Sequence, residues 1–82
     1  MEGFCYCYRV RSRQNAGQVY TGLTDNLAAR LAKHNAGGCP HTAKFRPWDL
    51  EMAIAFRSRE KAAAFEAYLK TGSGQEFARR HF

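Results

Sequence analysis

Two tyrosines on neighbouring predicted strands are the first residues whose types and spacing suggest chemistry. Tyr8 lies in the aromatic segment 4–10 and Tyr20 in segment 18–23, with Ser, Asn and Gly between them, which predicts two strands joined by a turn. In a symmetric hairpin Tyr8 lies directly opposite Tyr20, with Cβ atoms about 4.5–5.5 Å apart. Gly22 removes a side chain from the same face, so a ligand or backbone can approach. The pair is either a shared phenol site or a structural aromatic pair.

A polar pair follows on the next predicted helix. Arg30 and His34 are four residues apart, so they share one helix face, with Asn26 a turn earlier and Leu27 and Leu31 on another side. The two side chains could therefore belong to one site. A solvated polar face would have the same spacing.

Glu66 is the third candidate, because it falls inside an apolar stripe. The stripe consists of Ala62, Phe65 and Leu69. A carboxylate at the buried edge of a helix is costly unless a cation or a donor pairs with it. Its partner is therefore either an Arg or Lys side chain in a structural ion pair, or a bound divalent cation.

Basic and aromatic residues come together between the first helix and the third strand. His41, Lys44, Arg46 and Trp48 lie in a predicted loop, and such a mixture suits phosphate contact and stacking. We expect Lys44 and Arg46 to contact phosphates. Trp48 follows Pro47, and we expect it to pack at the edge of the core.

Three cysteines, Cys5, Cys7 and Cys39, do not make a paired disulfide framework. Reduced thiols in the cytoplasm are the natural interpretation. Together with His34 or His41 they could in principle bind zinc, but two cysteines two positions apart on a strand, without a second close pair, are not the usual zinc pattern.

The elements that must position these side chains follow from residue periodicity. Leu50, Met52, Ile54 and Phe56 alternate with small or polar residues, which predicts a third strand. Thr24, Asp25 and Asn26 offer cap side chains for the first helix, and Ser58 can cap a helix that runs to about residue 70. Ser73 and Glu76 form a capping box for a last helix. The predicted order is β-β-α-β-α-α, a small α+β domain whose three-stranded antiparallel sheet is flanked by helices.

Length and charge narrow the class of protein. The 82 residues, taken as one domain over 1–82, carry a formal charge of +6. Excess positive charge favours binding to a polyanion such as DNA. A basic protein without such a partner could have the same composition. No apolar stretch approaches the roughly 20 residues of a membrane span. The start of the chain lacks the pattern of a signal peptide, so we expect a cytoplasmic domain that does not enter a membrane.

Five landmarks in chain order resemble the GIY-YIG nuclease family, in particular small stand-alone members related to the nuclease part of the bacterial excision-repair endonuclease. The landmarks are Tyr6-Cys7-Tyr8 for the family's Gly-Ile-Tyr, Tyr20-Thr21-Gly22 for its Tyr-Ile-Gly, the helix 27–34, the helix 65–70 and the tail 71–82. Two departures stand out: Tyr6 replaces a glycine, and Leu23 stands where the repair enzyme has a lysine.

The resemblance implies a role for each candidate residue. Glu66 would hold one Mg²⁺ or Mn²⁺, and Tyr8 or Tyr20 would activate the attacking water. Arg30 would neutralise charge that develops on the phosphate, and His34 would assist the water or the phenol. The implied function is metal-dependent hydrolysis of phosphodiester bonds in duplex or branched DNA, for example in DNA repair, by a homodimer or with a partner protein.

Two other functions fit the same residues. One is a DNA-binding module of this fold with weak or no turnover, which would keep the basic surface without needing a cation. The other is a basic domain that binds a protein, which would show no salt-dependent affinity for DNA.

Overall fold

A computed structural model describes residues 3–82. The first two residues of the predicted 1–82 domain, which also begin the segment tested for a signal peptide, lie outside this range. The elements are β1 (Cys5–Ser12), β2 (Val19–Thr24), α1 (Leu27–Asn35), α2 (Pro40–Ala43), β3 (Trp48–Phe56), α3 (Arg59–Leu69) and α4 (Gly72–His81). The predicted α+β class and order of the long elements are confirmed, with the one-turn helix α2 added inside the predicted basic loop.

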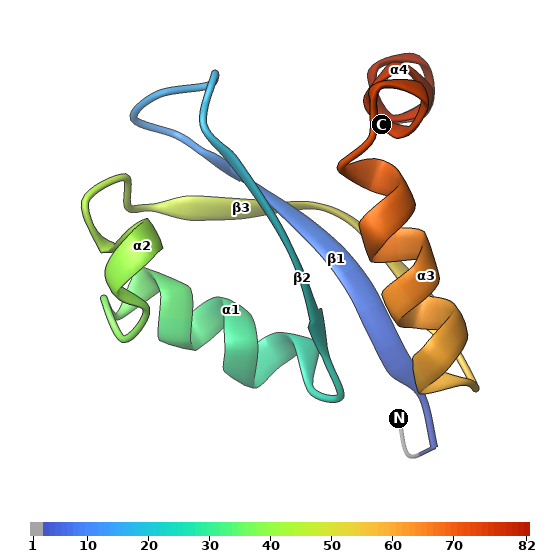
Figure 1. Ribbon diagram of the computed structural model, residues 1–82. Helices are drawn as coiled ribbons and strands as arrows, with labels where there is room; N and C mark the ends of the chain where they lie inside the picture. Colours follow the sequence, from blue (N-terminus) through green and yellow to red (C-terminus); the bar gives the residue numbers. More distant parts are fainter. Residues whose placement is uncertain (1–2) are drawn as a thin grey trace.

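One antiparallel sheet, in the strand order β2-β1-β3, lies between two layers of helices (Figure 1). Side chains alternate between its faces. Tyr8 and Val10 of β1 pack with Leu27 and Leu31 of α1. Their neighbour Cys7 packs against α3 and α4, in a cluster that includes Leu69, Ala78, Phe65, Phe77 and Phe82. The central strand therefore serves two separate cores.

The hairpin between β1 and β2 has a different register from the predicted one. Tyr8 pairs with Gly22, and Tyr20 pairs with Val10, so the direct pairing of the two tyrosines is wrong by two positions. Asn15 sets this register: its side chain accepts a hydrogen bond from Gly17 N at 3.1 Å, and its carbonyl accepts one from Gln18 N at 2.9 Å. Because the shift is an even number of residues, both tyrosines stay on one face.

The helix ends agree with the sequence at two positions and differ at a third. Asn26 caps α1 and Ser58 caps α3, as predicted. The predicted cap of α4 at Ser73 is wrong, because Thr71 takes that role. The Thr71 hydroxyl accepts a hydrogen bond from Gly74 N at 3.0 Å and donates one to Tyr68 O at 2.6 Å. One residue thus ends α3 and begins α4, which leaves no room for a later cap.

None of the helices in residues 3–82 is both long and apolar enough to cross a membrane. The thiols of Cys5, Cys7 and Cys39 are free. Burial and nearby Glu66 raise the pKa of Cys7 to about 11, so this thiol stays protonated at neutral pH and serves as a small apolar side chain.

Candidate active site

Gly22 allows the two tyrosines to meet. Tyr8 lies across from it in the sheet, and the Tyr8 and Tyr20 ring centroids are 6.2 Å apart. A Cβ atom at position 22 would lie 2.8 Å from Tyr8 Oη and 3.0 Å from Tyr20 Cε1. Any side chain there would displace both phenols. The space that the sequence assigned to an approaching ligand is filled by the phenol of Tyr8 itself.

His34 lies beside these rings and is almost fully buried, at 1% exposure. Its Nε2 is 2.9 Å from Tyr8 Oη, and its Nδ1 is 2.8 Å from Thr42 Oγ1. The centroid of the Tyr20 ring is 5.0 Å from that of the imidazole. His34 therefore belongs to a buried polar network and not to a solvated helix face. Helix α1 supplies the histidine, and the short helix α2 supplies Thr42.

The hydrogen-bond partners determine which nitrogen of His34 carries the proton. The Thr42 hydroxyl donates to Cys39 O at 3.3 Å, so its oxygen accepts from His34 Nδ1–H. At the other end, the guanidinium of Arg30 lies near the Tyr8 phenol and can only donate, so the Tyr8 proton points to His34 Nε2. Both constraints assign the same neutral tautomer, with the proton on Nδ1.

The pKa values of this network favour neutral groups. Burial raises the pKa of Tyr8 to about 12, and the nearby Arg30 guanidinium only partly opposes this effect. The pKa of His34 is lowered, first by burial and then by the positive charges of Arg30 and Lys33. At neutral pH the phenol thus keeps its proton, and the imidazole Nε2 stays unprotonated and accepts the hydrogen bond from Tyr8. The resting network is a chain of neutral donors and acceptors.

Arg30 is held close to this network by the backbone of β2. Its Nη1 donates to Leu23 O at 3.4 Å, a long contact that leaves most of the guanidinium donors free, and the residue is half-buried. Arg30 and His34 project from the same helix toward Tyr8. The structure therefore brings four of the predicted site residues together: Tyr8, Tyr20, Arg30 and His34.

Glu66 lies on α3, across the sheet from α1 (Figure 1). It forms neither a hydrogen bond nor an ion pair with those four side chains. Its ion-pair partner in residues 3–82 is Lys70, whose Nζ lies 3.7 Å from Glu66 Oε2. The Glu66 side chain is 23% exposed and that of Lys70 is 61% exposed. Glu66 thus forms an ion pair with a lysine, which was one of the two predicted alternatives; the other was a bound divalent cation.

The donor set around Glu66 fits one kind of metal ion. Within the part of the chain that the structure describes, no three or more His, Cys, Asp or Glu residues gather as a metal cluster. A single half-buried carboxylate held by one distant lysine suits Mg²⁺ or Mn²⁺, because Mg²⁺ commonly binds one or two carboxylates and keeps water and substrate phosphate as its other ligands. It does not suit an ion that requires a full set of protein ligands.

Among the loop residues, the structure confirms the predicted environment of Trp48 only, which was packing at the edge of the core. Trp48 is buried, and its indole N–H donates to Thr42 O at 2.8 Å. Lys44 is exposed, with its ammonium 5.4 Å from the centre of the Phe45 ring. Arg46 is exposed but turns back to donate to Ala43 O at 2.7 Å. Phosphate contact by these two cations stays a prediction.

Thr42 is the site residue that sequence reasoning missed. It is buried, yet it lies in a segment predicted to be an open basic loop. Pro40 at the start of α2 was the available signal, because proline favours the first turn of a helix. One helical turn after Cys39 carries the Thr42 hydroxyl inward to His34.

The fold and the site together define a class, small α+β domains of the nuclease type. Two phenols pack over a glycine of the three-stranded sheet, and the helix that follows carries arginine and histidine. Residues 4–80 match the GIY-YIG catalytic domain. The chain belongs to the GIY-YIG family, and this membership supports a nuclease role on DNA.

Relatives of two kinds are similar to this chain. A UPF0213 protein of Staphylococcus haemolyticus is 40% identical over 72 residues, which cover 87% of this chain and 85% of that protein. The structure-specific endonuclease subunit slx1 of Aspergillus clavatus is 42% identical over 69 residues, 77% of this chain but 16% of that protein. The corresponding protein of Giardia intestinalis is 32% identical over 66 residues, 76% of this chain and 18% of its own length. The chain thus spans less than a fifth of these longer relatives.

Proposed function

We propose that this protein is a metal-dependent endonuclease that hydrolyses phosphodiester bonds in DNA. The observation that carries the proposal is the buried chain of hydrogen bonds from Tyr8 through His34 to Thr42, next to the guanidinium of Arg30. Any buried phenol needs a hydrogen-bond partner, and here that partner is an imidazole nitrogen 2.9 Å away, a group that can also accept the proton. The arrangement suits proton transfer through a phenol.

Tyr8 is the better general base of the two tyrosines, because its hydroxyl contacts His34 Nε2. A phenol with a pKa of about 12 is not ionised at neutral pH, so it cannot act as a preformed phenolate. In the proposed step, water gives a proton to Tyr8 Oη while Tyr8 gives its own proton to His34 Nε2. The resulting hydroxide attacks phosphorus, the bond from phosphorus to the leaving sugar oxygen breaks, and that oxygen takes a proton from solvent. The imidazolium remains hydrogen-bonded to Thr42 through Nδ1–H. Tyr20 would orient the water or the phosphate.

Arg30 and Glu66 supply the charges that the reaction needs. The free donors of Arg30 would stabilise negative charge that develops on the phosphoryl oxygens in the transition state. Glu66 would hold Mg²⁺ or Mn²⁺, which, when bound, supplies Lewis-acid polarisation of the phosphate. Lys70 would turn away from Glu66, and this costs little because an exposed i, i+4 ion pair contributes only about 0.3–0.5 kcal/mol.

Substrate and assembly are part of the same proposal. The formal charge of +6 and the exposed Lys44 and Arg46 support binding of duplex or branched DNA through phosphates. The name of the Aspergillus relative describes a structure-specific endonuclease subunit, which supports cleavage beside a partner protein or a second copy. DNA repair is the process that we propose for this activity. Free thiols support a cytoplasmic location.

The test compares nicking of supercoiled plasmid in Mg²⁺, Mn²⁺ and EDTA, with Glu66→Gln beside the wild type. Nicking should require the cation and should be lost in Glu66→Gln, whose melting temperature in EDTA should stay close to that of the wild type. Glu60→Gln is the matched control, because Glu60 is an exposed carboxylate on the same helix. Salt-dependent DNA binding without nicking would instead identify a binding module. Full activity in Glu66→Gln would contradict the metal-ligand role.

A further inference from the structure

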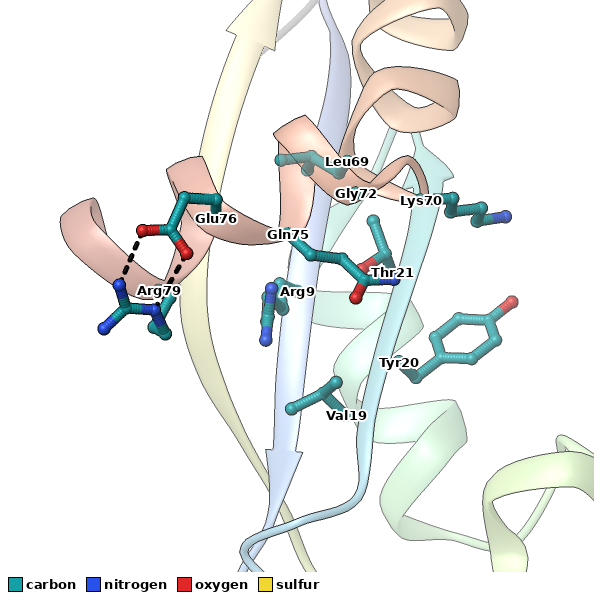
Figure 2. Close-up of a pocket in the computed structure, with 10 residues that line it drawn as sticks. All are labelled: Arg9, Val19, Tyr20, Thr21, Leu69, Lys70, Gly72, Gln75, Glu76 and Arg79. Atoms are coloured by element: carbon teal, nitrogen blue, oxygen red, sulfur yellow. Dashed lines mark hydrogen bonds and ion pairs between the residues drawn. The ribbon is translucent and has the colours of Figure 1, made fainter.

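A cleft of about 730 Å³ lies between the β1–β2 part of the sheet and α4 (Figure 2). Its polar lining comes from Arg9, Thr21, Lys70, Gln75, Glu76 and Arg79. It lies on the α3–α4 side of the sheet, away from His34 and Thr42. Tyr20 also borders it, so the cleft and the tyrosine cluster adjoin at the edge strand β2.

We propose that this cleft, hereafter the Arg9 cleft, binds an unpaired nucleic-acid strand next to the phosphodiester that is cut. The inference rests on the proposed nuclease function and adds to it a subsite on the opposite face of the sheet. A strand that passes Tyr20 at the edge of β2 enters the Arg9 cleft on one side and the tyrosine cluster on the other.

The walls of the cleft carry more positive than negative charge. Glu51 is shared by two arginines, with its oxygens 2.8 Å from Arg9 Nε and 2.7 Å from Arg11 Nε. Glu76 is likewise shared by Arg79 and Arg80. Of these residues Arg9, Glu76 and Arg79 line the cleft together with Lys70, so the lining holds three cations and one carboxylate. A surplus of arginine charge around a groove is what a phosphate backbone requires.

Arg9 itself retains unused hydrogen-bonding capacity. Its side chain is 15% exposed, and its buried Nε faces Glu51 Oε2 at 2.8 Å in an ion pair. This ion pair uses Nε and leaves the donors of the two terminal nitrogens, which a phosphate oxygen in the cleft could accept from. Arginine is well suited to such contacts.

The size and lining of the cleft favour an unpaired strand over a duplex. Its volume lies in the range of small-molecule sites, about 300–1,000 Å³. A duplex is too large for such a space, since its major groove alone is about 12 Å wide and admits a whole α-helix. Gln75 and Thr21 both line the cleft (Figure 2) and offer neutral hydrogen-bonding groups to sugars or bases. Val19, at 37% exposure, adds an apolar surface at the rim, and Tyr20 adds an aromatic one.

Gly72 provides a clean way to test the cleft. It lines the cleft as the first residue of α4, and a Cβ atom there would meet no other atom within 4 Å. Gly72→Glu would place a negative charge in the cleft without a steric clash. An acidic side chain at a helix N-terminus also suits the helix dipole, so the fold should be kept. Gly72→Gln has the same shape without the charge and is the matched control.

The measurement is fluorescence anisotropy in EDTA with two labelled probes, a short oligo(dT) strand and a blunt duplex. Gly72→Glu should weaken binding of oligo(dT) about tenfold, equivalent to 1.4 kcal/mol, and reduce its salt dependence. Gly72→Gln should bind like the wild type, and duplex affinity should change less than about twofold. Equal binding of oligo(dT) by all three proteins, or an equal loss on both probes, would overturn the proposal. Because EDTA prevents metal-dependent cleavage, a failure of the nuclease function would appear only in the plasmid assay.

Discussion

The two faces of the sheet place polar groups in opposite environments. On the α1 face, the hydroxyl of Tyr8, the imidazole of His34 and the hydroxyl of Thr42 are buried, uncharged and joined by hydrogen bonds of 2.9 and 2.8 Å. On the α4 face, Arg9 and Arg11 share one carboxylate beside an open cleft. The same strand, β1, supplies residues to both faces, because its side chains alternate.

This difference separates two tasks that a small domain must perform. Proton transfer requires a fixed path with little water, and the buried network supplies it by hydrogen bonds that specify one tautomer. Binding of a flexible polyanion requires accessible charge, and the cleft supplies it with guanidinium groups that solvent can reach. Substitutions in the buried network should therefore change the rate of cleavage, and those of the arginines in the Arg9 cleft should change affinity.

The largest effect should come from Tyr8→Phe, which removes the first hydroxyl of the buried network. Loss of the general base should lower the cleavage rate about 10²–10⁴-fold. The unpaired His34 Nε2 should cost about 1–3 kcal/mol of stability. Single-turnover cleavage and a melting curve measure the two effects. Tyr68→Phe is the control, because Tyr68 is exposed on the other side of the sheet. A fully active Tyr8→Phe variant would remove Tyr8 from the mechanism.

Arg30→Ala tests the charged neighbour of that network. It should lower the cleavage rate about 10²–10³-fold and leave DNA affinity within a few-fold, since the guanidinium acts in the transition state. Lys33→Ala, which removes an exposed cation from the same helix, should stay close to wild type. If Arg30→Ala unfolds the domain, Arg30 is a structural residue held by Leu23.

Thr42→Val keeps the shape of the side chain but removes the acceptor for His34 Nδ1–H. For comparison, loss of the outer hydrogen-bond partner of a metal-bound histidine costs about 10–100-fold, and we expect a decrease of that size in cleavage. The ¹⁵N chemical shifts of His34 should change at the same time, because they report the tautomer. Thr42→Ser keeps the hydroxyl and should restore both measurements. An unchanged tautomer in Thr42→Val would contradict the assigned role.

The smallest effect should be on stability as a function of pH. The pKa of His34 is lowered in the folded protein, whereas its unfolded value is about 6.5. Above that pH the histidine is neutral in both states, so it contributes no pH dependence. As the pH falls below about 6.5, the unfolded chain binds a proton that the folded chain does not, and the free energy of unfolding decreases until the folded pKa is reached.

Urea unfolding at several pH values between 7 and 5 measures this decrease, in a range where the carboxylates remain largely ionised. His34→Gln should remove the decrease, whereas His81→Gln should keep it, because His81 is exposed. If the free energy of unfolding of the wild type instead increases as the pH falls from 7 to 5, His34 is charged in the folded state.

Local patterns in the sequence were sufficient to predict the elements of this fold. The caps at Asn26 and Ser58 depend on side chains that bond to their own helix, and the alternation in 50–56 is a property of one strand. Features that depend on neighbouring elements were harder to predict. Thr71 caps α4 because it also ends α3, and the hairpin register depends on bonds made by Asn15.

The candidate site shows the same division. Tyr8, Tyr20, Arg30 and His34 were predicted from one face of a hairpin and one face of a helix, and they do lie together. Thr42 could not be found in this way, because its position depends on where α2 packs against α1. The same holds for the Arg9 cleft, whose two walls belong to β1–β2 and to α4, far apart in the chain.

Gly22 limits the order in which substitutions can accumulate in this domain. A side chain at position 22 overlaps the phenols of Tyr8 and Tyr20, so a first step that replaces the glycine disrupts the site at once. Replacement of Tyr8 by a smaller residue removes the nearest atom and opens space for a later change at position 22. The two positions are therefore coupled in their evolution. A lineage that keeps the two phenols in place must therefore also keep the glycine.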